Sequence, residues 1–364
     1  MRTLVVSDLH LGSQSKLDAL RDRRLREPLL EAVAGCERLV LLGDLLELRH
    51  GPERNALAAA REPLSELGDA LGPEREVIIV PGNHDHHLLD GWLQRRSGTA
   101  VPPALGLGTE VDWAAGETLA RVAGWLAPAR VRAAYPGLWL RPDVYAFHGH
   151  YADLHLTIPT MERLAAGAMG RIVALPETGP HCTEDYEAAL APIYAWIHAI
   201  AQRVDAEHAG SLHGGSVRGW TALTGPGRRG LRRRAMAAGF PVLVAGLNRA
   251  RIGPLRSELS GAALRRSGLR GAEEVATRLG VRAQYVIFGH THRAGPLLGD
   301  DIQEWRTASG VRLLNSGCWV EEPSFLGPVP GESPYRVGFC IRVGDQGPPA
   351  LVNLLDDVRF GPGL

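Results

Sequence analysis

The sequence has few cysteines and no long apolar run. Its 364 residues include only Cys36, Cys182, Cys318 and Cys340, and no two of these are close in sequence. This spacing argues against a disulfide framework or a zinc cluster, and it predicts buried, small apolar side chains in a reducing compartment. No apolar run is long enough to span a bilayer, and no charged-then-apolar leader precedes the first expected strand. These absences predict a cytoplasmic protein.

Lysine is nearly absent, and the charges are unevenly distributed. Lys16 is the only lysine, and the formal net charge is zero. Residues 211–270 nevertheless contain twelve arginines and a single acidic residue, Glu258. One interpretation is a solvated basic loop around residues 225–230. Another is a surface that collects anions beside a phosphate-binding site.

A third interpretation of the arginine-rich stretch 211–270 is peripheral contact with an acidic membrane at its inner face. Residues 235–247 are apolar and are flanked by arginines 232–234 on one side and by Arg249 and Arg251 on the other. Nucleic acid is a weaker option, because no aromatic residues are interleaved with the basic ones. The sequence specifies no oligomeric state.

Five short polar segments follow apolar runs along the chain. They are Asp8-Leu9-His10, Gly43-Asp44, Gly82-Asn83-His84-Asp85, His148-Gly149-His150 and Gly289-His290-Thr291-His292. The preceding runs, at residues 4–6, 39–42, 77–80, 144–147 and 285–288, are typical of strands that are buried on both faces. Helical patterns at 25–33, 57–71 and 272–279 lie between strands, the second interrupted near Pro63. The chain therefore predicts an α/β fold with polar groups at the carboxyl ends of its strands.

These segments, in this order, resemble the pattern of the calcineurin-like metallophosphoesterase superfamily. The resemblance implies a two-sheet sandwich flanked by helices, built from residues 1–150 and 281–364. It also implies hydrolysis of a phosphomonoester, phosphodiester or pyrophosphate by attack of a metal-bound hydroxide. Residues 8–12 and 43–47 further resemble the UDP-diacylglucosamine pyrophosphatase branch. That branch, however, typically has an arginine at the position of His84.

The resemblance also implies a set of functional residues for two divalent cations. Manganese is the expected metal, and mixed imidazole and oxygen ligands also suit iron or zinc. Asp44 would bridge the cations. The other implied ligands are Asp8, His10 and His292 for one cation, and Asn83, His148 and His290 for the other. His84 would stabilise the transition state or protonate the leaving group, with Asp85 holding its ring.

The remaining histidines carry weaker signals. His150 either lies at the edge of the site or simply follows its strand. His86 and His87 are expected on the surface of the loop after Asp85. His50, His155, His181, His198, His208 and His213 match no motif, and no role is predicted for them.

Residues 151–280 form an insertion between the fourth and fifth segments. Their first half has helical periodicity, and their second half is the arginine-rich stretch. Such an insertion would cover the metal site as a cap, which excludes water and selects substrates. The alternative to an enzyme is a non-catalytic metal-binding scaffold with the same fold. The complete ligand set argues against it, because such proteins commonly lose ligands.

Overall fold

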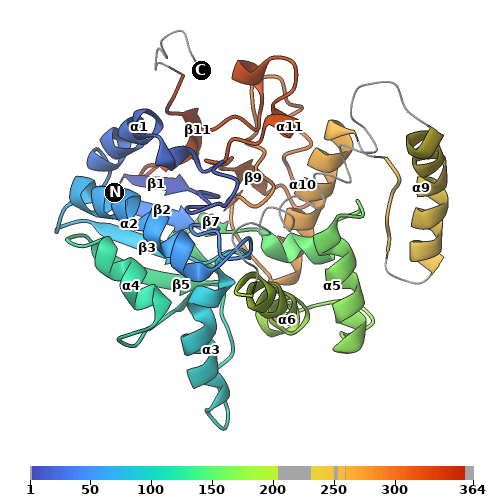
Figure 1. The fold of residues 1–364 in the computed structure, drawn as a ribbon, viewed down its shortest axis with the longest axis horizontal. Helices are drawn as coiled ribbons and strands as arrows, with labels where there is room; N and C mark the ends of the chain where they lie inside the picture. The colour runs from blue at the N-terminus through green and yellow to red at the C-terminus, as the bar shows by residue number, and fades with distance from the viewer. Residues whose placement is uncertain (1, 204–230, 250–252, 259, 357–364) are drawn as a thin grey trace.

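The computed structural model describes residues 2–203, 231–249, 253–258 and 260–356. Two β-sheets stack on each other, and helices cover their outer faces (Figure 1). The strand order is β11-β10-β1-β2-β3-β5-β4 in the first sheet and β6-β7-β8-β9 in the second. This architecture confirms the two-sheet α/β sandwich that the sequence predicts.

The strands of each sheet share a direction over most of its width. In the first sheet β1, β2, β3 and β5 run parallel, and in the second β7, β8 and β9 do. The first sheet consists of β1 (Thr3–Val6), β2 (Arg38–Leu42), β3 (Glu76–Val80), β4 (Thr109–Glu110), β5 (Arg130–Tyr135), β10 (Phe339–Val343) and β11 (Ala350–Asn353). The second consists of β6 (Gly137–Arg141), β7 (Val144–Phe147), β8 (Tyr285–Phe288) and β9 (Arg312–Asn315). At one edge of the first sheet, β10 pairs with β11 in the antiparallel direction.

The short apolar runs form strands because both of their faces are buried. In β1, Leu4 and Val6 belong to the core beneath the helices, whereas Val5 belongs to the core between the two sheets. Successive side chains of a strand point to opposite faces, so a strand in a middle layer must be apolar throughout. Val40 and Ile287 meet Val5 in the inter-sheet core from β2 and β8.

The helices of the outer layers largely match the predicted periodicity. They are η1 (Ala19–Arg21), α1 (Arg23–Ala34), α2 (Glu53–Leu71), η2 (His86–Leu89), α3 (Asp90–Ser97), α4 (Thr118–Trp125), α11 (Pro323–Leu326) and η4 (Pro330–Glu332). The side chain of Asp22 caps the first turn of α1. The predicted interruption at Pro63 is wrong, because α2 continues through it. Burial of the apolar face around Leu64 offsets the backbone hydrogen bond that proline cannot donate.

The insertion supplies a group of helices beside the sheets. They are η3 (His150–Leu154), α5 (Met161–Ile172), α6 (Thr183–Ala201), α9 (Leu231–Arg249) and α10 (Gly261–Arg278). Thr160 and Ser260 cap α5 and α10 with their side chains. Figure 1 shows α5 and α6 next to the sheets and α9 at the outer edge of the molecule. The predicted basic loop at 225–230 lies outside the described residues, as do His208 and His213.

The cysteines are free, and three of the four are buried as predicted. Cys182 is exposed, contrary to the prediction, because it occupies the residue that precedes α6. Within the described ranges, no helix has both the length and the apolar character needed to cross a membrane.

Candidate metal centre

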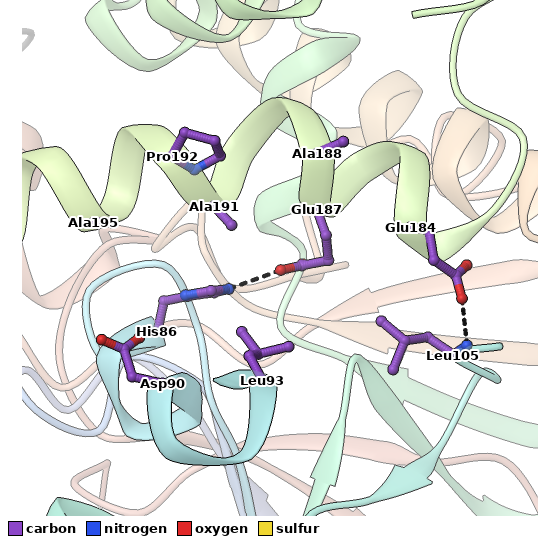
Figure 2. A pocket seen from close by; sticks show the side chains of 10 residues that line it. All are labelled: His86, Asp90, Leu93, Leu105, Glu184, Glu187, Ala188, Ala191, Pro192 and Ala195. Carbon is purple, nitrogen blue, oxygen red and sulfur yellow. Dashed lines mark hydrogen bonds and ion pairs between the residues drawn. The ribbon is translucent and has the colours of Figure 1, made fainter. Parts of the chain in front are cut away.

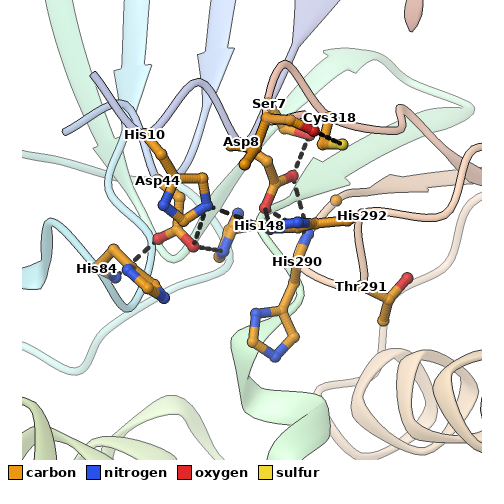
Figure 3. A network of polar contacts seen from close by, with 12 residues as sticks. Ser7, Asp8, His10, Asp44, His84, His148, His290, Thr291, His292 and Cys318 are labelled. Atoms are coloured by element: carbon orange, nitrogen blue, oxygen red, sulfur yellow. Dashed lines mark hydrogen bonds and ion pairs between the residues drawn. The ribbon is translucent and has the colours of Figure 1, made fainter. Parts of the chain in front are cut away.

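The polar segments meet because they leave the carboxyl ends of parallel strands. Asp8 follows β1, Asp44 follows β2 and Asn83 follows β3, all in the first sheet. His148 follows β7 and His290 follows β8 in the second sheet. Since the two sheets stack, their strand ends bring these loops into one cluster (Figure 3).

The backbone of this cluster is strained. Asp8, His10, Asp44, His290 and His292 have φ angles between 45° and 66°. They are five of the seven non-glycine residues with positive φ in the part of the chain that the structure describes. Such left-handed conformations cost about 1–2 kcal/mol per residue and concentrate at functional sites. They turn each chain sharply at the end of its strand.

The loop after β2 approaches His148 so closely that it requires a glycine at position 43. Gly43 has a φ of 86°, and a Cβ atom on it would lie 2.2 Å from the ring of His148. Any side chain at this position would therefore push His148 away from Asp44.

Asp8, His10 and His292 form the first group of facing ligand atoms. The Nε2 atoms of His10 and His292 are 3.2 Å apart, and Asp8 Oδ1 is 3.3 Å from His292 Nε2. His10 Nε2 also lies 3.7 Å from Asp44 Oδ2. One metal-binding atom from each of the three lies within 4.8 Å of the others. Nitrogen and oxygen atoms at these separations fit a single cation between them.

Asp44, His148 and His290 form the second group, again with ligand atoms within 4.8 Å. Asp44 Oδ2 is 3.2 Å from His148 Nε2. One terminal atom of the Asn83 amide lies 3.2 Å from His148 Nε2, His290 Nδ1 and Asp44 Oδ2. With the amide nitrogen toward these three atoms, the amide oxygen accepts from Arg49. A cation held by the three atoms would favour the opposite orientation, with the amide oxygen toward it.

Three of these imidazoles are oriented by a second contact. His10 Nδ1 lies 3.0 Å from Glu47, His148 Nδ1 lies 2.9 Å from the Leu42 carbonyl, and His290 Nε2 lies 2.8 Å from Asp153. In each ring the remaining nitrogen faces the cluster. Histidine ligands usually have such a partner on their other nitrogen, because it fixes the tautomer and the ring orientation. The donor set therefore fits two divalent cations.

The carboxylates and imidazoles of the cluster shift each other's pKa values in opposite directions. Burial alone would raise the pKa of Asp44, but His148 and His84 lower it well below its usual range. Burial opposes protonation of His148 and His10, yet the carboxylates beside them raise their pKa values to about 10 and about 9.

His84 is held by a residue to which the sequence analysis assigned no role. Its Nδ1 lies 2.7 Å from Glu47 Oε2, and the same oxygen is 3.0 Å from His10 Nδ1 and 3.0 Å from His50 Nδ1. Glu47 is almost completely buried. Burial, followed by the charges of Arg49 and His10, lowers the pKa of His84 to about 3, although Glu47 opposes this shift.

Asp85 does not have the contact that was predicted for it. Its Oδ1 accepts from the Gly82 amide at 2.7 Å, and its Oδ2 accepts from the amides of Leu45 and Leu46 at 2.7 and 3.3 Å. The prediction that it holds the His84 ring is therefore wrong. Asp85 is turned toward the loop after β2 and ties that loop to its own. Burial and the nearby Asp44 raise its pKa to about 6.

The neighbouring histidines lie deeper than the sequence suggests. His150 is buried behind the cluster, with its Nε2 3.0 Å from the hydroxyl of Tyr135. It belongs to none of the ligand groups found in the described residues. His86 is also buried, so its predicted surface position is wrong. Helix α6 covers it, and Glu187 from that helix lies 2.9 Å from His86 Nε2 (Figure 2).

His86 also lines a pocket of about 480 Å³ between α6 and α3. Figure 2 shows the side chains that line it: His86, Asp90, Leu93, Leu105, Glu184, Glu187, Ala188, Ala191, Pro192 and Ala195. The insertion therefore contributes one wall of a cavity next to the loop that carries Asn83 and His84.

Comparison with known proteins extends the sequence resemblance. The family model for calcineurin-like phosphoesterases matches residues 1–185. A dimetal phosphatase structure from Danio rerio is 14% identical, with 97% of this chain and 99% of that chain covered and a TM-score of 0.30. The cold-active protein-tyrosine phosphatase of a psychrophilic Shewanella species is 13% identical, with 94% and 74% covered and a TM-score of 0.27. At these TM-scores neither structure supports an argument about the site. No curated protein matches the chain.

Proposed function

Because the chain belongs to the calcineurin-like phosphoesterase family, we propose that it hydrolyses a phosphomonoester, phosphodiester or pyrophosphate at a centre of two divalent cations. The observation that carries the proposal is the position of Asp44 between the two ligand groups. Its Oδ2 is 3.7 Å from His10 Nε2 and 3.2 Å from His148 Nε2. Since the same oxygen faces both groups, Asp44 would be the ligand that the two cations share.

Each cation would take its other ligands from one group. Asp8, His10 and His292 would hold the first, and Asn83, His148 and His290 would hold the second. Two bound cations supply Lewis-acid stabilisation of phosphate oxygens and lower the pKa of a bound water. Manganese is the proposed metal, since the mixture of imidazole, carboxylate and amide ligands suits it, as it does iron and zinc.

The chain itself supplies the proton chemistry through His84. Glu47 fixes the Nδ1 of this ring and leaves Nε2 for the substrate. Burial lowers the pKa of this ring and so keeps it neutral. A phosphate that approaches Nε2 adds negative charge beside Glu47, and this favours the protonated ring. His84 can then stabilise the transition state or protonate the leaving group.

The remaining proposals concern the insertion. We propose that residues 151–280 act as a cap on a catalytic domain formed by residues 1–150 and 281–364. The pocket beside α6 supports a role of this cap in substrate selection. Helix α9 exposes Val242, Leu243 and Arg249, and this supports the proposal of peripheral contact with an acidic membrane. The resemblance to the UDP-diacylglucosamine pyrophosphatase branch stays a prediction.

The test is hydrolysis of a nitrophenyl phosphodiester and its monoester by metal-stripped protein, before and after addition of Mn²⁺. We expect cleavage only after the metal is added, and the preferred ester narrows the substrate class. Nucleotide-sugar and lipid pyrophosphates complete the panel, since a cap can reject small substrates. Metal-loaded protein that cleaves none of them would favour the alternative of a metal-binding scaffold.

A further inference from the structure

Three metal-binding side chains lie together outside the centre described above. Glu53 is the first residue of α2, His87 belongs to η2, and His198 comes from α6 of the insertion. One metal-binding atom from each lies within 4.8 Å of the others. His87 Nε2 is 3.6 Å from Glu53 Oε2, and the rings of His87 and His198 stack with centroids 3.9 Å apart. The cluster joins the insertion to the helices that cover the first sheet.

Both histidines of this cluster are held through Nδ1. His87 Nδ1 lies 2.6 Å from Asp90 Oδ2, and His198 Nδ1 lies 3.3 Å from the carbonyl oxygen of Leu48. A carboxylate or a backbone carbonyl on one ring nitrogen is the usual environment of a histidine whose other nitrogen binds a metal. The same arrangement is found at His10, His148 and His290. In both rings Nε2 therefore remains as the nitrogen that can bind a cation.

Glu53 is held in a matching way. Its Oε1 accepts from the hydroxyl of Thr118 at 2.5 Å, and Oε2 is the oxygen that faces His87. The backbone amide of Glu53 donates to the side chain of Gln202 just after α6, which brings the end of that helix to the start of α2. The side chains of His87 and Glu53 are 29% and 23% exposed, so an ion can reach them from solvent.

We propose that Glu53, His87 and His198 bind a third transition-metal ion, for which Zn²⁺ is the best match, and that this ion fastens α6 to the catalytic domain. Two histidines and one glutamate leave the fourth position of a tetrahedral zinc site to water. Zinc–ligand bonds of about 2.0–2.1 Å place neighbouring ligand atoms about 3.4 Å apart, close to the 3.6 Å between His87 Nε2 and Glu53 Oε2. The proposal does not rest on the phosphoesterase activity.

The first test counts zinc in the full-length protein after loading and desalting. We expect His198→Gln to lose one equivalent relative to the wild type. Asp44→Asn, which removes the shared ligand of the main centre, should retain one equivalent, and the double variant should retain none. His181→Gln is the matched control, because His181 is an exposed histidine near the same helix and outside the cluster.

The outcomes separate this site from the main centre. Equal zinc content in the wild type and His198→Gln overturns the third site, whatever happens to turnover. Loss of one equivalent in His198→Gln with no loss in Asp44→Asn supports the third site and contradicts the proposed main centre. If His198→Gln does not fold, Glu53→Gln replaces it.

A second test uses a spectroscopic readout and a positioning residue. Co²⁺-loaded Asp44→Asn should show the visible absorption of a four-coordinate cobalt ion, and the Asp44→Asn/His198→Gln double variant should lack it. Asp90→Asn leaves all three proposed ligands in place but removes the carboxylate that orients His87. It should weaken zinc binding about 10- to 100-fold. Unchanged affinity in a folded Asp90→Asn protein would contradict the proposed orientation of His87.

Discussion

The centre at the strand ends and the cluster on α6 are built in different ways. At the strand ends, the ligands lie in short loops with left-handed backbone, and most of them are almost completely buried. Around His198, the side chains come from helices with ordinary backbone and are partly exposed. The first kind of site is fixed by the fold of the sheets. The second exists only while the insertion packs against the sheets, so changes at the two sites should have separable effects.

The largest expected effect comes from Asp44→Asn. A neutral amide would be a much weaker shared ligand than the carboxylate, so we expect loss of metal from the strand-end centre. Activity should fall by about a thousandfold or more, which corresponds to about 4 kcal/mol of transition-state stabilisation. Metal content and kcat/KM measured on the same preparation check this. Asp112→Asn, an exposed aspartate paired with Arg95, is the control. Two tightly retained cations in Asp44→Asn would refute the bridge.

A smaller effect is expected from His84→Ala. Removal of a proton donor typically costs a factor of about 10²–10⁴ in rate. We expect kcat to fall by about two orders of magnitude while both cations remain bound, because His84 is not a proposed ligand. The measurement is turnover with metal analysis, and His181→Ala serves as the control. Unchanged turnover would remove His84 from the mechanism.

The next pair of variants distinguishes positioning from loop stability. Glu47→Gln should reduce kcat or metal affinity about 10- to 100-fold, with a change in the pH–rate profile and little change in melting temperature. Asp85→Asn should instead lower the free energy of unfolding by about 2–3 kcal/mol, because three backbone amides lose a charged acceptor. Kinetics and thermal unfolding of both variants provide the test. Unchanged stability of Asp85→Asn would contradict the role of Asp85 in tying the two loops together.

The smallest effect is expected where the insertion meets the core. Glu187 of α6 accepts hydrogen bonds from the hydroxyls of Tyr135 and Tyr151, both at 2.5 Å, and contacts His86. Glu187→Gln should lower the free energy of unfolding by about 1–2 kcal/mol. Turnover should change less than in any variant above, since Glu187 does not reach the strand-end ligands.

The Glu187 contribution should depend on pH in a defined direction. Burial raises the pKa of Glu187, but His86 and the tyrosine hydroxyls lower it further, so the net shift is downward. A depressed folded-state pKa contributes stability above the unfolded value of about 4.3 and loses it as the pH falls through the folded value. The difference in melting temperature between wild type and Glu187→Gln should therefore be constant above about pH 5 and shrink at lower pH. A difference that grows on acidification would contradict this assignment.

The sequence predicted the strand-end cluster well for a physical reason. A buried strand needs a continuous apolar run, and a residue that follows it must lie at the sheet edge. Asp8, Asp44 and His290 could therefore be located without knowledge of the pairing. The helices α1 and α10 were likewise visible from periodicity, and Gly35 marked the end of α1.

The residues that surround this cluster could not be predicted in the same way. Glu47 and Asp153 contact their histidines across 37 and 137 positions of sequence. The distance between each carboxylate and its histidine depends on how the loops turn after each strand. Asp85 was misassigned because adjacency to His84 in sequence says nothing about which way a side chain points. The contacts of His86 and His198 exist only because α6 packs over η2, and the sequence does not show this packing.

The strand-end centre has a consequence for the time at which the protein can acquire its metals. His10 and His292 face each other although 282 positions separate them in sequence. A ribosome that adds about 5–20 residues per second needs roughly 15–60 seconds to make that stretch. Strand β1 also pairs with β10, which is synthesised later still. The nascent chain therefore carries Asp8, His10 and Asp44 as an incomplete ligand set until His290 and His292 have been synthesised.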